Sequence, residues 1–337
     1  MSAVSEAQWD AFVDGRPEAT FFHKSAWRHV APRVFGHRAH YLADADGSGQ
    51  IRAVLPLVEV KSRLFGHALI SNAFTVGGGP LATNDAARAA IVEQAAALGR
   101  DLGVDYVELR DTPHGFPGWA ARDDLYATFE GPIAPAEEDN LTQIPRKQRA
   151  VVRKAFANGF TTSLDAGTEN FFDLYAGTMR KHGTPALPRR YFDTLKRTFG
   201  DACEILTVHH DGRPISSVLS FYFRGRVMPY YTGSHVRARV NGSNDMMYWS
   251  VMRRAVDLGC THFDFGRSKV GTGPYSFKKN WGFEPRPIAH QYYLVKADGL
   301  PNLNPTNPRY ELVIKAWRNL PQPVVNAVSP FISRSLA

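Results

Sequence analysis

The stretch that decides the fold is residues 204–235, EILTVHHDGRPISSVLSFYFRGRVMPYYTGSH. Its alternating and β-branched residues predict two strands paired around a turn at Asp211 and Gly212, with RVMPYYTGSH as a third strand. Residues 244–259 follow with a helical pattern that ends at a glycine, and residues 261–268, THFDFGRS, predict a further short strand. The order is therefore strand, strand, strand, helix, strand.

The first half of the chain has the same order. Residues 37–62 predict two strands around a turn, and residues 67–82 predict a third. An amphipathic helix pattern at 87–103 again ends in glycine, and VDYVELRD at 104–111 reads as a short buried strand. Two copies of one α/β unit would account for 337 residues, roughly twice the length of a typical domain.

Further helices precede the second set of strands, including a basic helix from about Pro145 to Asn158. The acidic, proline-containing stretch 131–140, GPIAPAEEDN, is the best candidate for a linker. We therefore predict two α/β domains with mixed sheets flanked by helices. The first spans residues 1–135, and the second spans residues 140–337 and includes a C-terminal tail.

Charge is divided unevenly between the two halves. Residues 1–139 contain 12 Lys and Arg against 19 Asp and Glu, whereas residues 140–337 contain 28 against 13, within a net charge of +8. A cationic second half favours a polyanionic substrate or co-substrate there. A simple bias toward solubility would give the same numbers.

Composition and motifs exclude several functional classes. The hydrophobic content of 44% is that of a globular chain, and Cys203 and Cys260 have neither disulfide nor metal-site spacing. The sequence lacks G-x-S-x-G, H-E-x-x-H, C-x-x-C, Walker A and G-x-G-x-x-G motifs. It therefore does not favour a serine hydrolase, a metalloenzyme, a P-loop enzyme or a Rossmann cofactor site, and we expect no metal.

The sequence has no apolar signal segment and no run of the ~18 apolar residues that a membrane span requires. We therefore expect a cytoplasmic protein. The tail, residues 307–337, has an amphipathic pattern with cations, but Pro321, Pro323 and Pro330 break it into short pieces. We expect it to pack across the domain interface, with peripheral contact to the inner membrane as the alternative.

The segment SFKKNWGFE at 276–284, after the β-β-β-α-β order, resembles the GNAT (N-acetyltransferase) fold, and two such units in tandem resemble the Fem-type transferases. The sequence is most similar to FemAB-like proteins associated with exosortase/PEP-CTERM and exopolysaccharide systems. The phrases that carry this similarity are IPRKQRAVVRKA (144–155), FYF (221–223), PYYTG (229–233), NDMMYWSVMRRA (244–255), FDFGRSKVGTGPYSFKKNWGFEP (263–285) and NPTNPRY (304–310).

The resemblance implies a tandem GNAT-like fold and a Fem-like N-acyltransferase. It implies no tightly bound cofactor, with aminoacyl-tRNA or acyl-CoA as the donor co-substrate. The acceptor would be an amine of a cell-envelope or exopolysaccharide precursor, and no DNA partner is expected. An acetyl-CoA-dependent GNAT acetyltransferase and a non-catalytic scaffold that binds RNA or polysaccharide are the alternatives.

The loop RVNGSND, which ends at Asp245, is the first candidate for donor binding. In a GNAT such a loop presents backbone N–H groups at a helix N-terminus to the pyrophosphate of coenzyme A. Arg239 and Gly242 match the GNAT pattern Q/R-x-x-G-x-G/A, and Asn244 is a candidate that departs from it, because Gly or Ala is usual at its position. Alternatively, Asn244 or Asp245 is an N-cap and Gly242 an ordinary turn residue. The first half has only GGGP at 77–80, so the working site is expected in the second domain.

The strand PYYTG contains two candidate proton donors. In GNAT-like enzymes this strand splays from its neighbour, often at a β-bulge, and a free backbone N–H polarises the acyl carbonyl. Pro229 and Gly233 suit such an irregular strand. Alternation places Tyr230 and Tyr231 on opposite faces, so one of them would face the cleft and donate a proton, unless both only pack within the sheet.

The strand THFDFGRSK ends in charged candidates, at a position where ligands gather in α/β sheets. Asp264 lies opposite two phenylalanines and is a candidate base for the attacking amine. Arg267 and Lys269 are candidates to hold a phosphate or polarise a carbonyl. Because these cations are expected to lower the pKa of Asp264, an ion pair that orients Arg267 is the alternative role.

Two further basic segments complete the candidate site. Lys278 shares a helix face with Tyr275 and is a candidate phosphate ligand. In PRKQRAVVRKA, Arg146, Arg149 and Arg153 recur at spacings of three and four on one helix face. Arg149 and Arg153 are therefore candidates to bind tRNA, coenzyme A or anionic lipid head groups, with a merely solvated face as the alternative.

Overall fold

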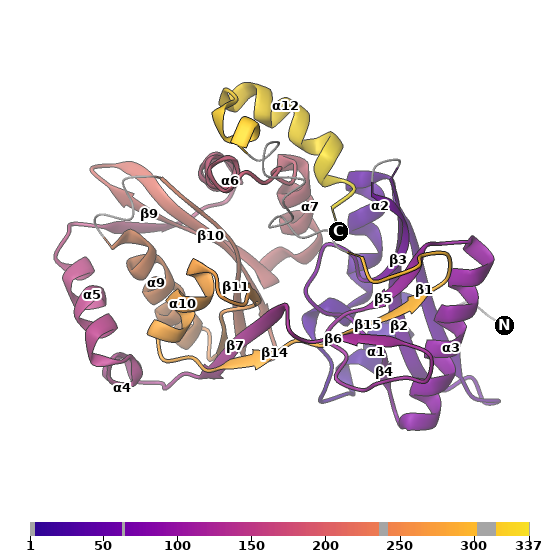
Figure 1. The fold of residues 1–337 in the computed structure, drawn as a ribbon. Helices are drawn as coiled ribbons and strands as arrows, with labels where there is room; N and C mark the ends of the chain where they lie inside the picture. Colours follow the sequence, from indigo (N-terminus) through magenta and orange to yellow (C-terminus); the bar gives the residue numbers. More distant parts are fainter. Residues whose placement is uncertain (1–3, 63–64, 236–241, 302–314, 337) are drawn as a thin grey trace. The chain divides into compact units, whose positions relative to one another are not determined.

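The computed structural model describes residues 4–62, 65–235, 242–301 and 315–336. The chain divides into two compact units (Figure 1). Unit 1 consists of Met1–Leu125, Ile288–Asn307 and Arg334–Ala337, and unit 2 consists of Tyr126–Pro287 and Pro308–Ser333. Each unit is described by itself below.

Unit 1 is built on a mixed sheet of seven strands in the described part of the chain. The order across the sheet is β1 (Arg38–Ala45), β2 (Ile51–Ser62), β3 (Gly66–Ser71), β5 (Tyr106–Leu109), β15 (His290–Leu294) and β6 (Ala120–Arg122), and β4 (Leu81–Ala82) pairs with β2. The strands β3 and β5 are parallel because the long helix α3 (Asp85–Leu102) connects them. The shorter helices are α1 (Glu6–Asp14) and α2 (Val30–Phe35), with 3₁₀ turns at Phe21–His23 and Ser25–His29.

The core of unit 1 follows from the sequence pattern. Leu55 and Leu57 of β2 pack with Leu69 of β3 and Ile91 of α3, and all four side chains are fully buried. The helix α3 begins at an ordinary cap, because the Asn84 side chain accepts a hydrogen bond from the backbone N–H of Ala87 at 2.9 Å.

Unit 2 contains a mixed sheet of eight strands in the described residues. The order is β13 (Ser268–Lys269), β7 (Tyr126–Pro132), β12 (His262–Asp264), β11 (Arg226–Ser234), β10 (Arg213–Phe223), β9 (Cys203–His210) and β8 (Thr161–Leu164), and β14 (Pro285–Pro287) pairs with β7. Its helices are α4 (Glu137–Gln143), α5 (Arg146–Phe156), α6 (Glu169–His182), α7 (Arg189–Phe199), α9 (Ser243–Asp257), α10 (Gly273–Asn280) and α12 (Gln322–Ser333), with a 3₁₀ turn at Gly200–Ala202.

The helices of unit 2 cover both faces of its sheet. Tyr231 of β11 packs against Tyr175 of α6 and Tyr191 of α7. The next residue along the strand, Thr232, hydrogen-bonds to Tyr248 of α9. Thus α6 and α7 lie on one face, and α9 lies on the other.

Both units have the predicted order of three antiparallel strands, a helix and a parallel strand, so the predicted α/β class with mixed sheets is confirmed. In each unit an antiparallel strand from a distant part of the sequence lies beside that parallel strand. In unit 1 it is β15, which pairs with β5, and in unit 2 it is β7, which pairs with β12. Each half of the chain therefore supplies one strand to the other unit.

The structure divides the chain differently from the predicted limits at residues 135 and 140. Sequence order assigns residues 126–132 to the first domain, but β7 pairs within the sheet of unit 2 and buries Phe129 in its core. The predicted linker 131–140 is ordered structure, because it includes the end of β7 and the start of α4. There the Asn140 side chain bonds both backbone groups of Ala134, each at 2.7 Å.

The C-terminal tail contains one continuous helix rather than the predicted short pieces. The helix α12 runs through Pro330, and it packs against α6 within unit 2 (Figure 1). Residues 307–314 of the predicted tail lie outside the described residues. Within the described ranges, no helix is both long enough and apolar enough to cross a membrane.

Candidate active site

The sheet of unit 2 opens between β11 and β12. These parallel strands pair at only two positions, Arg226 with His262 and Val227 with Phe263. The strand β12 ends at Asp264, whereas β11 continues to Ser234. Beyond Val227, the two strands therefore no longer pair with each other. The predicted splay at this strand is present.

A β-bulge at Tyr230 accompanies the splay. In the pairing of β10 with β11, Leu219 lies opposite Tyr231 and Ser220 lies opposite Pro229, so Tyr230 is the extra residue. A bulge bends its strand and puts neighbouring side chains out of strict alternation. The irregular strand that Pro229 predicted is thus observed.

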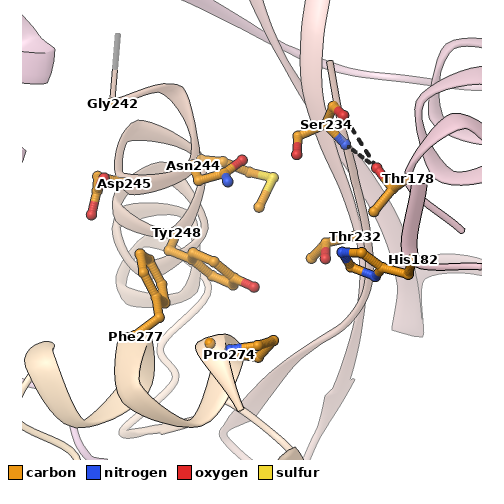
Figure 2. A pocket seen from close by; sticks show the side chains of 12 residues that line it. Thr178, His182, Thr232, Ser234, Gly242, Asn244, Asp245, Tyr248, Pro274 and Phe277 are labelled. Atoms are coloured by element: carbon orange, nitrogen blue, oxygen red, sulfur yellow. Dashed lines mark hydrogen bonds between the residues drawn. The ribbon is translucent and has the colours of Figure 1, made fainter. Parts of the chain in front are cut away.

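A pocket of about 470 Å³ lies in unit 2 beside this opening (Figure 2). Four elements line it. Its residues are Thr178 and His182 of α6, Thr232 and Ser234 of β11, Gly242, Asn244, Asp245, Met247 and Tyr248 around the start of α9, and Gly273, Pro274 and Phe277 of α10.

The wall formed by α6 and β11 is fixed by direct backbone contacts. The Ser234 N–H donates to the Thr178 hydroxyl at 2.8 Å, and that hydroxyl lies 3.2 Å from the Ser234 carbonyl (Figure 2). At Gly233 the helix approaches so closely that a Cβ atom would lie 2.2 Å from the backbone nitrogen of Tyr175. Glycine is required here because of this helix crossing, and not for the kink that the sequence suggested.

The helix α9 begins at a residue that makes no side-chain cap hydrogen bond, and Asp245 is the acidic residue of its first turn. Its N-cap is Gly242, in the left-handed conformation at φ 74°, and a Cβ there would meet Ala155 of α5 at 3.2 Å. The alternative that Asn244 or Asp245 is the N-cap is therefore wrong. Because glycine has no side chain, it makes no cap hydrogen bond to the first-turn N–H groups, in contrast to Asn84 at α3. Such an N-terminus binds anions.

Asn244 lies on the pocket side of α9 (Figure 2). Its side-chain oxygen is buried and has no hydrogen-bond partner in the part of the chain that is described. A ligand donor would satisfy this oxygen, since buried polar atoms are nearly always paired. The third residue of the predicted donor loop, Arg239, lies outside the described residues.

Asp245 is a buried carboxylate at the same helix terminus. One of its oxygens, Oδ1, accepts hydrogen bonds from Gln148 of α5 and from the indole N–H of Trp281, the latter at 3.2 Å. Burial raises the pKa of Asp245 to about 6. In Figure 2 its side chain points to the side of α9 away from Thr232 and His182. It therefore ties α9 to α5 and α10.

Tyr248 is the central polar group of the pocket, one helical turn after Asn244. Its hydroxyl points into the cavity between Thr232 and Pro274, and the His182 ring lies opposite (Figure 2). Burial raises the pKa of Tyr248 to about 12, despite its hydrogen bond with Thr232. The phenol is thus protonated at neutral pH and able to donate a proton or a hydrogen bond. Sequence reasoning missed this residue, although its i, i+4 spacing from Asn244 places both on one helix face.

The two predicted tyrosines do not line this pocket. Tyr230 and Tyr231 do not point to opposite faces as predicted, because the bulge interrupts the alternation and brings their ring centroids to 4.8 Å. The Tyr231 hydroxyl lies 3.1 Å from that of Tyr191, and Tyr230 packs on Phe221. Both belong to the aromatic layer beneath α6 and α7. Their role is therefore the alternative one, in which both tyrosines only pack.

Asp264 behaves differently from its predicted electrostatics. Burial raises its pKa, although the backbone N–H of Gly266 donates to it at 2.8 Å. The nearby cations do not lower the pKa below its ordinary value, which corrects the prediction. In the described residues Asp264 and Arg267 form no ion pair, and the Arg267 guanidinium stacks instead over Tyr126 at 4.3 Å.

Lys278 is buried rather than presented to solvent on the helix face with Tyr275. Its ammonium donates to the carbonyls of Gly266 and Arg267, at 2.8 and 3.1 Å. Burial lowers its pKa to about 7. Lys278 therefore holds the turn that follows β12, while Lys269 lies in β13, opposite Tyr126 of β7.

The basic helix is observed as α5, and its arginines have different surroundings. The Arg149 guanidinium bonds the carbonyls of Thr142 and Ile144, at 2.8 and 3.0 Å, and so fixes the turn between α4 and α5. Arg153 pairs with Glu138 of α4 at 3.1 Å. The neighbouring cations Arg146, Lys147 and Lys154 are exposed.

Metal ligands do not gather in the described ranges, where no group of three or more His, Cys, Asp and Glu side chains is placed to hold an ion. What is present is a splayed pair of parallel strands, an uncapped helix N-terminus and a pocket with a protonated phenol. These features define the class of protein, an acyl-transfer fold of the GNAT type.

Residues 143–279 match the family model of the acetyltransferase (GNAT) domain. This range runs from the end of α4 to α10 and contains every residue that lines the pocket. The matched range, 137 of the 337 residues, is similar to this domain, and the match supports an acyltransferase.

Solved structures with a similar fold cover both units. FemX has a TM-score of 0.70 at 16% identity, over 93% of this chain and 99% of that chain. L-PGS from Bacillus licheniformis has a TM-score of 0.55 at 13% identity, over 98% of this chain and 97% of that chain. A tandem GNAT protein from the clavulanic acid biosynthesis pathway has a TM-score of 0.52 at 13% identity, over 87% of this chain and 96% of that chain.

At these identities the likeness shows the fold alone, which is the Fem-like tandem GNAT fold. No curated protein matches the chain.

Proposed function

We propose that this protein is a Fem-like N-acyltransferase whose reaction takes place in the pocket of unit 2. It would transfer an aminoacyl or acyl group from a phosphate-bearing donor to an amine of a cell-envelope or exopolysaccharide precursor. The observation that carries the proposal is the position of the pocket, which lies where β11 extends beyond its pairing with β12 and at the glycine-capped N-terminus of α9. An acyl donor needs both features.

The donor's phosphate binds at the first turn of α9 in this proposal. The N–H groups there and the helix dipole attract an anion, and the Asn244 side-chain oxygen accepts from a donor group of the ligand. The exposed cations of α5 lie on the helix that contacts Gly242, so they add to the attraction. Arg239 remains a predicted phosphate ligand.

The acyl group extends from the phosphate along β11. The amine nitrogen attacks the acyl carbonyl carbon, a C–N bond forms, and the C–S or C–O bond to the donor breaks. In this proposal, backbone N–H groups of β11 beyond its pairing with β12 stabilise the negative charge on the carbonyl oxygen. Tyr248 gives its proton to the leaving sulfur or oxygen. The amine loses its excess proton to water, and the Tyr248 phenolate takes a proton back from water. Tyr248 thus takes the role that was predicted for Tyr230 or Tyr231.

Ligand titration tests the donor. Thermal unfolding would be followed with acetyl-CoA, with aminoacyl-tRNA and with uncharged bulk tRNA as the control. Saturable stabilisation by acetyl-CoA alone would assign the acetyl-CoA-dependent alternative, which the match to an acetyltransferase domain favours. Stabilisation by aminoacyl-tRNA beyond that of uncharged tRNA would assign the Fem-type donor. If neither donor stabilises the protein, the proposed donor site is wrong.

Removal of one hydroxyl tests the chemistry. Tyr248→Phe should lower kcat by about 10²-fold, with little change in the KM for the donor, because general acid catalysis acts on the transition state. The measurement is release of the donor's leaving group in the presence of a panel of amine acceptors. Tyr230→Phe is the matched control, since that phenol lies outside the pocket. Equal activity of the two variants would exclude Tyr248 as the proton donor.

A further inference from the structure

The helix α12 exposes a row of large apolar side chains. Val324, Val328 and Phe331 are 43%, 38% and 74% exposed. Their spacings of four and three residues put them on one face of the helix. The opposite face is buried through Val325, Ser329 and Ser333, each at most 2% exposed, and α12 packs against α6 of unit 2. The helix therefore has a packed inner face and an apolar outer face.

The outer face is held in place by the attachment of the tail to α6. Arg180 of α6 donates to the Leu320 carbonyl at 3.3 Å, and Arg318 donates to the carbonyl of His182 at 3.2 Å. Trp317 is buried just before the turn into α12. These contacts anchor the chain that leads into α12, so the apolar row has a fixed position on unit 2.

The charged residues in the described part of the tail, which contains this helix, are all basic. Residues 315–337 contain Lys315, Arg318 and Arg334 and no acidic residue. The last turn of α6, against which α12 packs, adds Arg180 and Lys181. An apolar helix face beside cations is the pattern of a helix that lies in the interface of an anionic bilayer.

We propose that α12 docks unit 2 on an anionic bilayer surface, with Phe331 as the principal inserting side chain. The charge favours this partner over a second copy of the chain. An isologous interface centred on α12 would bring two equal sets of cations together, whereas anionic head groups neutralise them. Because only three large side chains insert, binding should be reversible and sensitive to salt.

The helix α6, on which α12 packs, connects this apolar surface to the pocket. His182 lines the pocket, and its carbonyl accepts the hydrogen bond from Arg318. Docking would therefore hold α6, one wall of the pocket, near the membrane. This step rests on the proposed function: it identifies the acceptor as an amine on a membrane-anchored precursor. The docking itself requires no catalytic activity.

Vesicle co-sedimentation of the full chain tests the docking. The probes are phosphatidylcholine vesicles with and without phosphatidylglycerol, at low and high salt. We expect binding to the anionic vesicles only, weakened by salt and reduced at least several-fold by Phe331→Ser. Leu164→Ser is the matched control, because Leu164 of β8 is 51% exposed and lies far along the sequence from α12. Thermal unfolding of both variants verifies that they fold.

Three results would overturn the proposal. They are equal binding of Phe331→Ser and the parent protein, equal binding to neutral and anionic vesicles, and no binding to either. Light scattering without vesicles tests whether α12 instead contacts a second copy of the chain. A dimer that Phe331→Ser abolishes would establish that contact in place of membrane docking. Because no donor is needed, failure here is distinguishable from failure of the proposed reaction.

Discussion

Asp245 is a charged group that unit 2 keeps buried at a cost. Its folded-state pKa of about 6 lies above the ordinary 3.8, because burial disfavours the carboxylate. The folded state therefore binds a proton more tightly than the unfolded state does. The contribution of Asp245 to the free energy of unfolding is fully present below about pH 4 and is lost as the pH rises through 6.

Asp245→Asn should therefore stabilise the protein at pH 8. The gain should be ~2–3 kcal/mol, because a pKa raised from 3.8 to about 6 corresponds to ~3 kcal/mol and a carboxylate gains ~0.3–1 kcal/mol at a helix N-terminus. The amide oxygen of the variant still accepts from Trp281. Urea unfolding from pH 4 to pH 8 measures the difference, which should shrink toward zero at pH 4. A variant less stable than the parent at pH 8 would contradict this account.

The tyrosines illustrate what sequence could and could not predict about the candidate site. The loop at Gly242 and the irregular strand were predictable, because glycine, proline and helix starts have local signatures. The faces of Tyr230 and Tyr231 were not, because one bulge residue reverses the alternation that follows it. The raised pKa of Asp264 was also missed, since burial depends on distant packing that no spacing reveals.

At the scale of elements, the crossing of α6 over β11 sets one wall of the pocket. Gly233→Ala would place a methyl group 2.2 Å from the Tyr175 nitrogen, so the helix must move away from the strand. We expect a loss of about 1–3 kcal/mol or more in the free energy of unfolding, as for other overpacked sites. Because Thr178 and Ser234 would separate as well, donor-induced stabilisation should also weaken.

Gly177 provides the matched control on the same helix. Nothing lies within 4 Å of a Cβ built there, so Gly177→Ala adds only helix propensity. It should stabilise the protein by about 0.5–1 kcal/mol. Urea unfolding of the two variants side by side separates crowding from propensity. If Gly233→Ala is as stable as the parent, the close approach does not fix this wall.

The order of elements was largely predictable from sequence, and their pairing was only partly so. Strand and helix periodicities depend on a few neighbouring residues, so β9 to β11 and α9 follow the predicted pattern. The partners of β7 and β15 are determined by contacts across most of the chain. A strand of five to seven residues contains no local signal for the sheet that it joins, so the domain limits were predicted from chain order alone.

For the whole molecule, the exchange of β7 and β15 makes the two halves of the chain depend on each other. A fragment of residues 1–135 lacks β15, which pairs with both β5 and β6. A fragment of residues 140–337 lacks β7 and with it the fully buried Phe129, whose loss alone would cost about 3–5 kcal/mol. Since domains are typically stable by only about 5–15 kcal/mol, neither fragment should fold by itself.

Together the two fragments contain every described strand, because β7 is in the first and β15 is in the second. Co-expressed, they should therefore associate through these strands and co-purify as one folded complex, whereas each alone should be insoluble or lack a cooperative unfolding transition. Tagging one fragment and measuring capture of the other, with circular dichroism of the product, tests this. Cooperative unfolding of either fragment alone would show that its unit does not require the exchanged strand, and the limits at 135 and 140 would then describe independent domains.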